Sequence, residues 1–323
     1  MSPSVRTELL FLFLSLSSRT VLSRYIEVRS TSPKPAYVVP DSQTCTFRRT
    51  IPQTDYILFS TWRCLDMLAI EGHFTFVASS PQQLSCAAFI IGEPSEVIGL
   101  ELSDVNIDCD VGDFIKIFDG WVLKGEKFPS SQDHPLPLHQ RYTDICSSTP
   151  PSHASRSSQN VAMVFFRIHN PDSGFTLVVK KLPNPFPCNI MSQSPEGSFT
   201  MVMPHQHRNC SFSIIYPVEI QLAQLSLEQA KSNELSSGCS GSGDYVELLG
   251  GNGVDTSRMF PVADLCFPLS GLAQMKISCD NSVVRLVSSG NYINRVSFRY
   301  RLLERHQLPE AQENSLDNMC NVE

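Results

Sequence analysis

The chain has 323 residues, with 32 acidic and 25 basic side chains and a formal net charge of −7. Because nucleic-acid binding requires a basic surface, this mildly acidic balance argues against a nucleic-acid partner. The longest apolar stretch beyond the first 23 residues runs from Val161 to Phe166, far short of the roughly 20 residues that cross a bilayer, so we predict no membrane span.

The first residues have the pattern of an export signal. Arg6 precedes an apolar run at residues 9–16, and Val21-Leu22-Ser23 places a small residue at a cleavage position. The alternative is a buried helix of the mature fold. We predict that residues 1–23 are a signal peptide, removed near Ser23, and that the mature protein is secreted and extracellular.

Eleven cysteines follow, and none forms a Cys-x-x-Cys pair, so zinc-ribbon and thioredoxin-type motifs have no support. Behind an export signal the default is a disulfide framework. Cys86 follows Cys64 by 22 positions, and Cys210 follows Cys188 by the same number. Pairing neighbours in order leaves Cys45 over and predicts Cys64–Cys86, Cys109–Cys146, Cys188–Cys210, Cys239–Cys266 and Cys279–Cys320.

The cysteine spacing belongs to a longer internal repeat. Gly72–Phe76 before Cys86 matches Gly197–Met201 before Cys210. The stretch that begins at Gly112-Asp113 after Cys109 likewise matches the one that begins at Gly243-Asp244 after Cys239. Matched landmarks in the same order indicate that one unit has been duplicated.

Both copies contain short strand-like segments separated by turn residues. Apolar and β-branched residues fill 114–118, 161–168, 175–179, 283–287 and 296–300, and no stretch shows sustained helical periodicity. Many short strands with turns between them predict an all-β protein built from antiparallel β-sandwich domains.

Prolines at 183, 185 and 187 predict a linker, because proline cannot donate to a strand ladder. The predicted organisation is an N-terminal extension (24–59), a first domain (60–182), the linker (183–187), a second domain (188–303) and a tail (304–323) tied back through Cys320.

No catalytic constellation emerges, and we predict neither enzyme activity nor a cofactor. Ser242 stands where a Gly-x-Ser-x-Gly elbow needs glycine, and His205 with His207 lacks a third metal ligand. Asp113 and Asp244 could serve as paired carboxylates or calcium ligands, but they lie in separate repeats. Asn209-Cys210-Ser211 is an Asn-x-Ser sequon, so we predict a glycan on Asn209.

The duplicated pattern of paired cysteines and a Gly-Asp-aromatic strand resembles the CUB domain, an extracellular β-sandwich. Two longer strings, Phe118–Pro137 and Pro204–Pro217, resemble the corticotropin-releasing factor-binding protein family, over about residues 24–303. The resemblance implies two CUB-like domains in tandem, stapled by the same five successive disulfides. It also implies a secreted protein that sequesters corticotropin-releasing factor and urocortin-like peptides and so limits receptor activation. The alternative is an extracellular CUB-type adaptor that recruits proteases or matrix proteins.

The resemblance also directs attention to residues around Cys64. In the family, an arginine four residues before this cysteine and an aspartate two residues after it are tied to ligand binding. Asp66 matches the aspartate, whereas Ser60 occupies the arginine position and Arg63 lies nearby. We take Asp66 and Arg63 as candidate ligand-binding residues, the alternative for Asp66 being a solvated or capping carboxylate.

Calcium-binding CUB domains carry a further acidic residue after a later strand. Here that region reads 166–170 in the first copy and 286–290 in the second, and neither contains a carboxylate. We therefore predict no metal site. The sequence leaves open the preferred peptide, the position of the binding groove, the state of Cys45 and whether ligand drives dimerisation.

Overall fold

The computed structural model describes residues 44–50, 58–63, 65–77, 84–146, 154–170, 173–227, 239, 243–266, 273–304 and 320. Residues 44–323 form one compact unit. Within the described ranges the chain is built from β-strands with short 3-10 turns, which confirms the predicted all-β class. No helix among these residues is long and apolar enough to cross a membrane.

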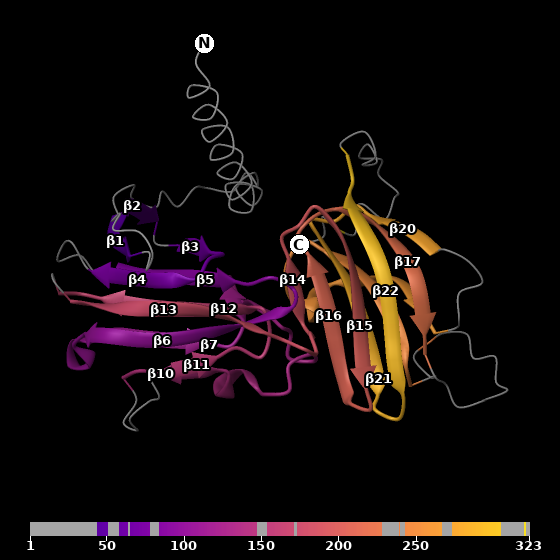
Figure 1. Ribbon diagram of the computed structural model, residues 1–323, viewed down its shortest axis with the longest axis horizontal. Helices are drawn as coiled ribbons and strands as arrows, with labels where there is room; N and C mark the ends of the chain where they lie inside the picture. The colour runs from indigo at the N-terminus through magenta and orange to yellow at the C-terminus, as the bar shows by residue number, and fades with distance from the viewer. Residues whose placement is uncertain are drawn as a thin grey trace, which may run out of the picture. The chain divides into compact units, whose positions relative to one another are not determined.

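The first sandwich consists of two sheets (Figure 1). One sheet has the order β11-β6-β13-β4-β1-β2 and the other β10-β7-β12-β5-β3. A separate hairpin joins β8 (Trp121–Leu123) to β9 (Glu126–Phe128). The strands of the two sheets are β1 (Thr44–Thr50), β2 (Leu58–Arg63), β3 (Leu65–Leu68), β4 (Gly72–Val77), β5 (Leu84–Ile91), β6 (Glu96–Asn106), β7 (Phe114–Phe118), β10 (Tyr142–Asp144), β11 (Ala154–Arg156), β12 (Val161–Ile168) and β13 (Gly174–Pro183).

The second sandwich has one sheet of order β14-β16-β21-β18-β19 and one of order β15-β22-β17-β20. Its strands follow one another after the linker, and their colour runs from salmon red through orange to yellow in Figure 1. They are β14 (Ile190–Ser192), β15 (Glu196–Pro204), β16 (His207–Ile214), β17 (Val218–Ser226), β18 (Tyr245–Gly251), β19 (Phe260–Leu265), β20 (Ala273–Ile277), β21 (Asn281–Ser289) and β22 (Ile293–Leu302).

The duplication seen in the sequence extends to the order of the strands. The arrangement β11-β6-β13-β4 has its counterpart in β20-β17-β22-β15, and β10-β7-β12-β5-β3 has its counterpart in β19-β18-β21-β16-β14. Even the parallel pairs correspond, since β3 runs parallel to β5 and β14 runs parallel to β16. Each half is therefore a copy of one antiparallel sandwich with a single parallel edge pair among the described strands.

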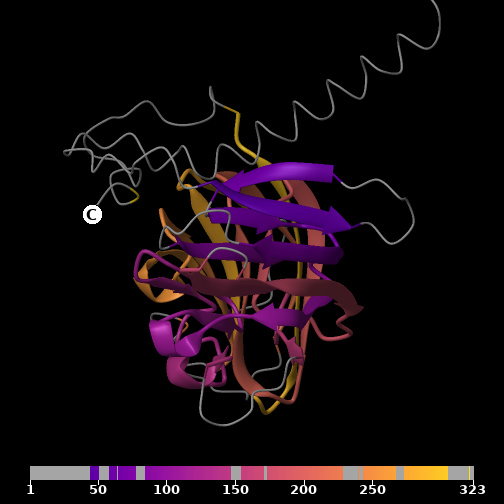
Figure 2. The same cartoon turned by 90° about the vertical axis from the view of Figure 1, so that its left-hand side faces the viewer.

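The first copy carries two additions. Strand β1, in the segment predicted as an N-terminal extension, pairs antiparallel with both β4 and β2 and so continues the first sheet. These indigo strands lie beside one another in Figure 2. The second addition is the segment between β7 and β10, which contains the β8–β9 hairpin.

Each sandwich encloses its own apolar core. Phe76, Phe166 and Phe175 meet in the first core with ring centroids 4.8–5.1 Å apart. Phe212 and Phe298 meet edge to face at 5.2 Å in the second. Aromatic pairs of this kind add about 0.5–1.5 kcal/mol beyond the burial of their surface.

Disulfides occur in both halves. The structure contains Cys109–Cys146, Cys188–Cys210, Cys239–Cys266 and Cys279–Cys320. Cys86 is disulfide-bonded as well, whereas Cys64 lies outside the described residues. Cys45 falls within β1, but its side chain is not described.

Candidate functional site

The two predicted ligand-binding residues lie on consecutive strands of the first sandwich. Arg63 is the last residue of β2, and Asp66 is the second residue of β3, opposite Ala88 of β5 in the parallel register. Their side chains lie outside the described part of the structure. The next residue, Met67, packs against an apolar cluster, and its Sδ contacts Gln193 of the second sandwich. The strand that carries Asp66 therefore lies at the contact between the two sandwiches.

That apolar cluster forms on the face of the β5 sheet turned away from the first core. Phe89 and Trp121 meet edge to face with centroids 5.5 Å apart, and Phe128 of the hairpin is fully buried. Met191 and Val254 of the second sandwich join the same cluster. Since these side chains are nearly inaccessible, the cluster is a packed contact between the two halves rather than an open groove.

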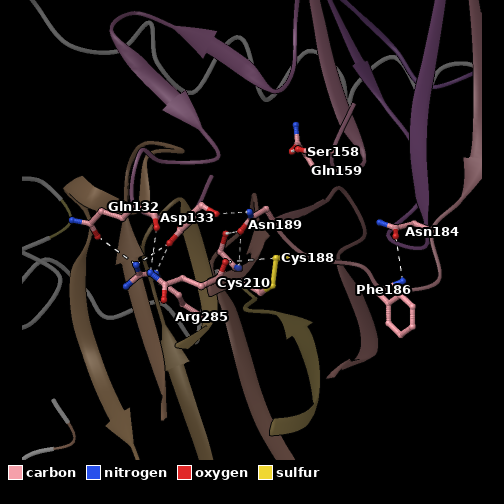
Figure 3. The surroundings of a disulfide bond; sticks show 12 residues. Gln132, Asp133, Ser158, Gln159, Asn184, Phe186, Cys188, Asn189, Cys210 and Arg285 are labelled. Carbon is pink, nitrogen blue, oxygen red and sulfur yellow. Dashed lines mark hydrogen bonds and ion pairs between the residues drawn. A yellow bond between two sulfur atoms is a disulfide. The ribbon is translucent and has the colours of Figure 1, made fainter. Parts of the chain in front are cut away.

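A polar network continues this contact (Figure 3). The Asp133 carboxylate is completely buried and accepts hydrogen bonds from Arg285 Nε at 2.8 Å and from Thr256 Oγ1 at 2.7 Å. Asn189 Nδ2 donates to the Asp133 carbonyl at 3.0 Å, and Arg285 Nη1 also pairs with Glu247 at 2.6 Å. Three residues of the second half, Arg285, Thr256 and Asn189, thus converge on Asp133 of the first.

The charge of Arg285 is stabilised by its partners. Burial lowers the pKa of its guanidinium, but Asp133 and Glu247 more than offset that effect, so the pKa lies above the ordinary value of 12.5. A buried cation is tolerated only where it is paired and hydrogen-bonded. Glu247 belongs to the same sandwich as Arg285, whereas Asp133 is supplied by the first sandwich, so full pairing of Arg285 depends on the contact between the two.

The loop that carries Asp133 is shaped by Arg141. This buried guanidinium donates to the carbonyl oxygens of Pro129 at 2.7 Å, Ser130 at 3.2 Å and Leu136 at 3.0 Å. Three fixed donors of one planar group hold the loop in a single conformation. Asp133 is therefore presented to Arg285 by a preorganised segment.

The β8–β9 hairpin makes a second polar contact between the two sandwiches. Glu126 Oε2 accepts a hydrogen bond from the Val254 backbone N–H at 2.8 Å. A Cβ at Gly253 would lie 2.1 Å from the same oxygen, so the Glu126 carboxylate could keep this position only beside a glycine and would have to shift for any larger residue. The string Phe118–Pro137, which carries much of the family resemblance, thus includes the residues that join the sandwiches.

The sequon also lies beside this contact. Asn209 is half-buried on β16, next to the Cys188–Cys210 disulfide, and its Nδ2 donates to the Gln132 carbonyl at 3.3 Å. Because an N-linked glycan attaches at Nδ2, the sugar would have to leave the remaining N–H free for this bond.

The two aspartates considered as calcium ligands are engaged by protein donors. Asp113 is buried, and its Oδ1 accepts from the His169 backbone N–H at 2.8 Å and contacts His169 Nδ1 at 2.6 Å. Its Oδ2 accepts from the Asp108 backbone at 3.1 Å. In the second copy the buried Asp244 accepts a hydrogen bond from the Ser289 backbone. In the described ranges no three or more His, Cys, Asp or Glu side chains gather as a metal site would require.

One grouping resembles a catalytic triad but lacks its geometry. Asp119 Oδ2 and Ser158 Oγ lie 3.0 and 3.2 Å from the same nitrogen, Nε2 of His134. The opposite nitrogen, Nδ1, accepts the Leu136 backbone N–H at 3.0 Å. A triad needs the serine and the aspartate on opposite ring nitrogens, so His134 acts here as a buried structural link.

Two antiparallel β-sandwiches in tandem, each containing disulfides, define the class of this molecule as a two-domain β-sandwich protein. The packed contact between them, formed by the apolar cluster around Trp121 and Phe128 and by the Asp133–Arg285 network, is called the seam below. Residues 57–183 match the family described as "Corticotropin-releasing factor binding protein N-terminal domain", and residues 190–309 match the corresponding C-terminal domain family. The chain belongs to this family.

Full-length relatives support the assignment. The corticotropin-releasing factor-binding protein of Homo sapiens is 51% identical over 323 residues, covering 99% of both chains. Those of Mus musculus and Xenopus laevis are each 52% identical, also covering 99% of both chains. Among solved structures, the CUB1-EGF-CUB2 domains of rat MASP-1 align with 73% of this chain and 99% of that one, at 11% identity and a TM-score of 0.27.

Proposed function

We propose that this protein is secreted and sequesters corticotropin-releasing factor and urocortin-like peptide hormones, limiting activation of their receptors. The observation that carries the proposal is the identity of about half of all residues to corticotropin-releasing factor-binding proteins over nearly the whole of both chains. Both halves match the corresponding domains of that family.

The region of β2 and β3 is where we propose that the peptide is bound, with Asp66 and Arg63 contributing to it. This strand pair lies beside the seam, where Met67 already contacts the second sandwich. A peptide of this class pays several kcal/mol for ordering when it binds, so a rigid surface favours affinity. The seam network supplies such rigidity by fixing the two halves together.

The adaptor alternative is less well supported. Adaptors of the CUB type normally bind through calcium. Here the carboxylates of Asp113 and Asp244 instead accept hydrogen bonds from backbone N–H groups, and Asp113 also contacts the His169 imidazole. We therefore propose a metal-independent binding protein with no catalytic role.

The remaining assignments follow the family. We propose that residues 1–23 are the signal peptide, 24–59 an N-terminal extension, 60–182 and 188–303 the two domains, 183–187 the linker and 304–323 the tail. Strand β1 of the extension adds to the sheet of the first domain. We also propose that Asn209 is glycosylated. The Cys279–Cys320 disulfide supports the tail assignment, since it connects residue 320 to the second sandwich.

A receptor-shielding assay tests the proposed function. Cells that carry a corticotropin-releasing factor receptor and a cAMP reporter are titrated with the hormone at several fixed concentrations of the purified protein. We expect the half-maximal hormone concentration to rise in step with the added protein, and an unrelated agonist of the same pathway to be unaffected. An unchanged dose–response curve with correctly disulfide-bonded protein would contradict the proposal.

The same assay tests Asp66. Because hydrogen bonds to charged groups contribute about 1.5–3 kcal/mol, Asp66→Ala should weaken shielding about tenfold to a hundredfold. The matched control is Asp110→Ala, which removes an exposed carboxylate elsewhere in the same sandwich and should leave shielding unchanged. Equal behaviour of the two variants would remove Asp66 from the site.

A further inference from the structure

The second sandwich has a cavity on the outer face of its four-stranded sheet. The cavity has a volume of about 650 Å³ and is lined by residues of all four strands, which lie side by side in the order β15-β22-β17-β20 (Figure 1). Neither the seam nor the β2–β3 region contributes a residue to it. A cavity of this size lies within the range of about 300–1,000 Å³ typical of ligand sites.

The alternation of β22 explains why this outer face is charged. Val296, Phe298 and Tyr300 point into the core, so Arg299 and Arg301 project from the opposite face. Successive residues of a strand face opposite sides, which places both guanidinium groups in the cavity.

One of the two arginines is already neutralised. Arg301 donates to the carboxylate of Glu219, which is only 4% exposed and also accepts a hydrogen bond from the Gln274 amide. Arg301 and Gln274 therefore satisfy the carboxylate, and Arg301 lines the cavity as a member of this ion pair.

The other arginine is not neutralised. Arg299 is exposed and makes no side-chain hydrogen bond or ion pair with any residue that the structure describes. Ser198 of β15 and Gln221 of β17 lie opposite it in the strand register. A guanidinium flanked by a hydroxyl and an amide is a suitable receptor for a carboxylate, which it can bind through two parallel hydrogen bonds.

We infer that this cavity is a subsite for the peptide ligand, in which Arg299 binds an acidic side chain of the peptide. The inference rests on the proposed function and extends it from the first sandwich to the second. Glu196 also lines the cavity and makes no ion pair among the described residues, so a basic side chain of the same peptide can pair with it.

A peptide carboxylate fits this lining better than a polyanion does. Glu196 and Glu219 place two negative charges beside Arg299 and Arg301, and the chain as a whole carries a net charge of −7. A sulfated glycan would meet repulsion from these carboxylates, whereas one acidic side chain needs only the guanidinium that has no partner.

The test is a fluorescence-anisotropy titration of labelled corticotropin-releasing factor with the wild type, Arg299→Gln and Arg295→Gln. Arg295 is the matched control, because it is exposed on the same face of the same strand but does not line the cavity. We expect Arg299→Gln to weaken binding about tenfold or more, as loss of a charged hydrogen bond predicts, and Arg295→Gln to bind like the wild type.

A set of peptides, each with one acidic residue changed to its amide, identifies the partner. One of these changes should weaken binding to the wild type but not to Arg299→Gln, as expected for two groups that interact directly. Tight binding by the wild type with no loss in Arg299→Gln would overturn this inference while leaving the proposed function intact. No binding by the wild type would overturn both.

Chromatography on a heparin column at physiological salt tests whether the cavity binds a polyanion instead of the peptide. Retention of the wild type that is lost in Arg299→Gln, together with unchanged peptide affinity, would assign the cavity to a sulfated glycan and contradict the inference. Flow-through of all three proteins is the result we expect.

Discussion

Replacing Asp133 with alanine should destabilise the contact between the sandwiches more than any surface substitution. The change leaves Arg285, whose side chain is 9% exposed, with Glu247 as its remaining ion-pair partner and leaves the buried Thr256 hydroxyl without its acceptor. Breaking a buried pair from one side costs about 3–5 kcal/mol, and the partner that remains places the expected loss near the lower end, at about 3 kcal/mol.

The assay is urea and thermal unfolding of the oxidised protein, followed by circular dichroism. At about 2.1 cal/mol/K of unfolding entropy per residue, each kcal/mol moves the midpoint of the unit 44–323 by about 1.7 °C, so Asp133→Ala should lower Tm by about 5 °C. Asp133→Asn should cost less, since its amide oxygen can still accept from Thr256.

The control is Glu101→Gln, which removes one partner of the exposed Lys180–Glu101 pair. These side chains are 57% and 51% exposed, and such a pair contributes at most about 1 kcal/mol. The reasoning is refuted if Asp133→Ala is as mild as Glu101→Gln, or if the effects of Asp133→Ala and Arg285→Met simply add in the double variant.

Three further predictions concern pH, glycosylation and metal. The Gln274 side chain, together with Arg301 and against the effect of burial, holds the pKa of Glu219 below its ordinary value of 4.5. The ionised Glu219 carboxylate therefore contributes its full stabilisation above pH 4.5, and this contribution is lost as the pH falls through the lower pKa of the folded state. Glu219→Gln should make the free energy of unfolding, measured with urea at a series of acidic pH values, fall less steeply as the pH is lowered. Asn209→Gln should abolish the mass decrease that a peptide N-glycosidase produces in the secreted protein, and an unaltered decrease would move the glycan elsewhere. A calcium chelator should leave Tm and peptide affinity unchanged, and a fall in either would show that a metal site exists.

The sequence predicted the elements of the fold that depend on local pattern. The alternating stretch 114–118 is strand β7, and the apolar stretch 161–168 is strand β12, with the same limits. Both are bounded by turn residues, and period-two alternation is a property of consecutive residues that needs no tertiary information. The repeat landmarks Gly112-Asp113 and Gly243-Asp244 also lie just before equivalent strands, β7 and β18.

What the sequence did not predict depends on contacts between distant residues. Strand β1 falls in a polar stretch, and it forms because the edge of β4 offers unpaired backbone groups. Asp133 and Arg285 are 152 positions apart, and nothing local to either residue indicates the other. The string Phe118–Pro137 was identified as specific to the family, but its role in joining the sandwiches was not predicted. The signal available in the sequence was an aspartate, Asp133, within a segment rich in turn residues.

The candidate site was likewise predicted only in part from the sequence. Asp66 and Arg63 were selected through family resemblance, and the structure adds their position on β2 and β3 beside the seam. The Arg299 cavity could not be predicted, because it depends on which of four charged side chains pair with one another. Arg301 and Glu219 are brought together by the pairing of β17 with β22, and only their pairing reveals that Arg299 has no partner.

Calorimetric titration of the purified, oxidised mature protein with corticotropin-releasing factor tests the central claim most directly, with an unrelated amphipathic peptide as control. The account predicts nanomolar, saturable binding with a negative heat-capacity change, as burial of apolar surface requires, and no heat with the control. Absence of heat with both peptides, or equal heat with both, would contradict it.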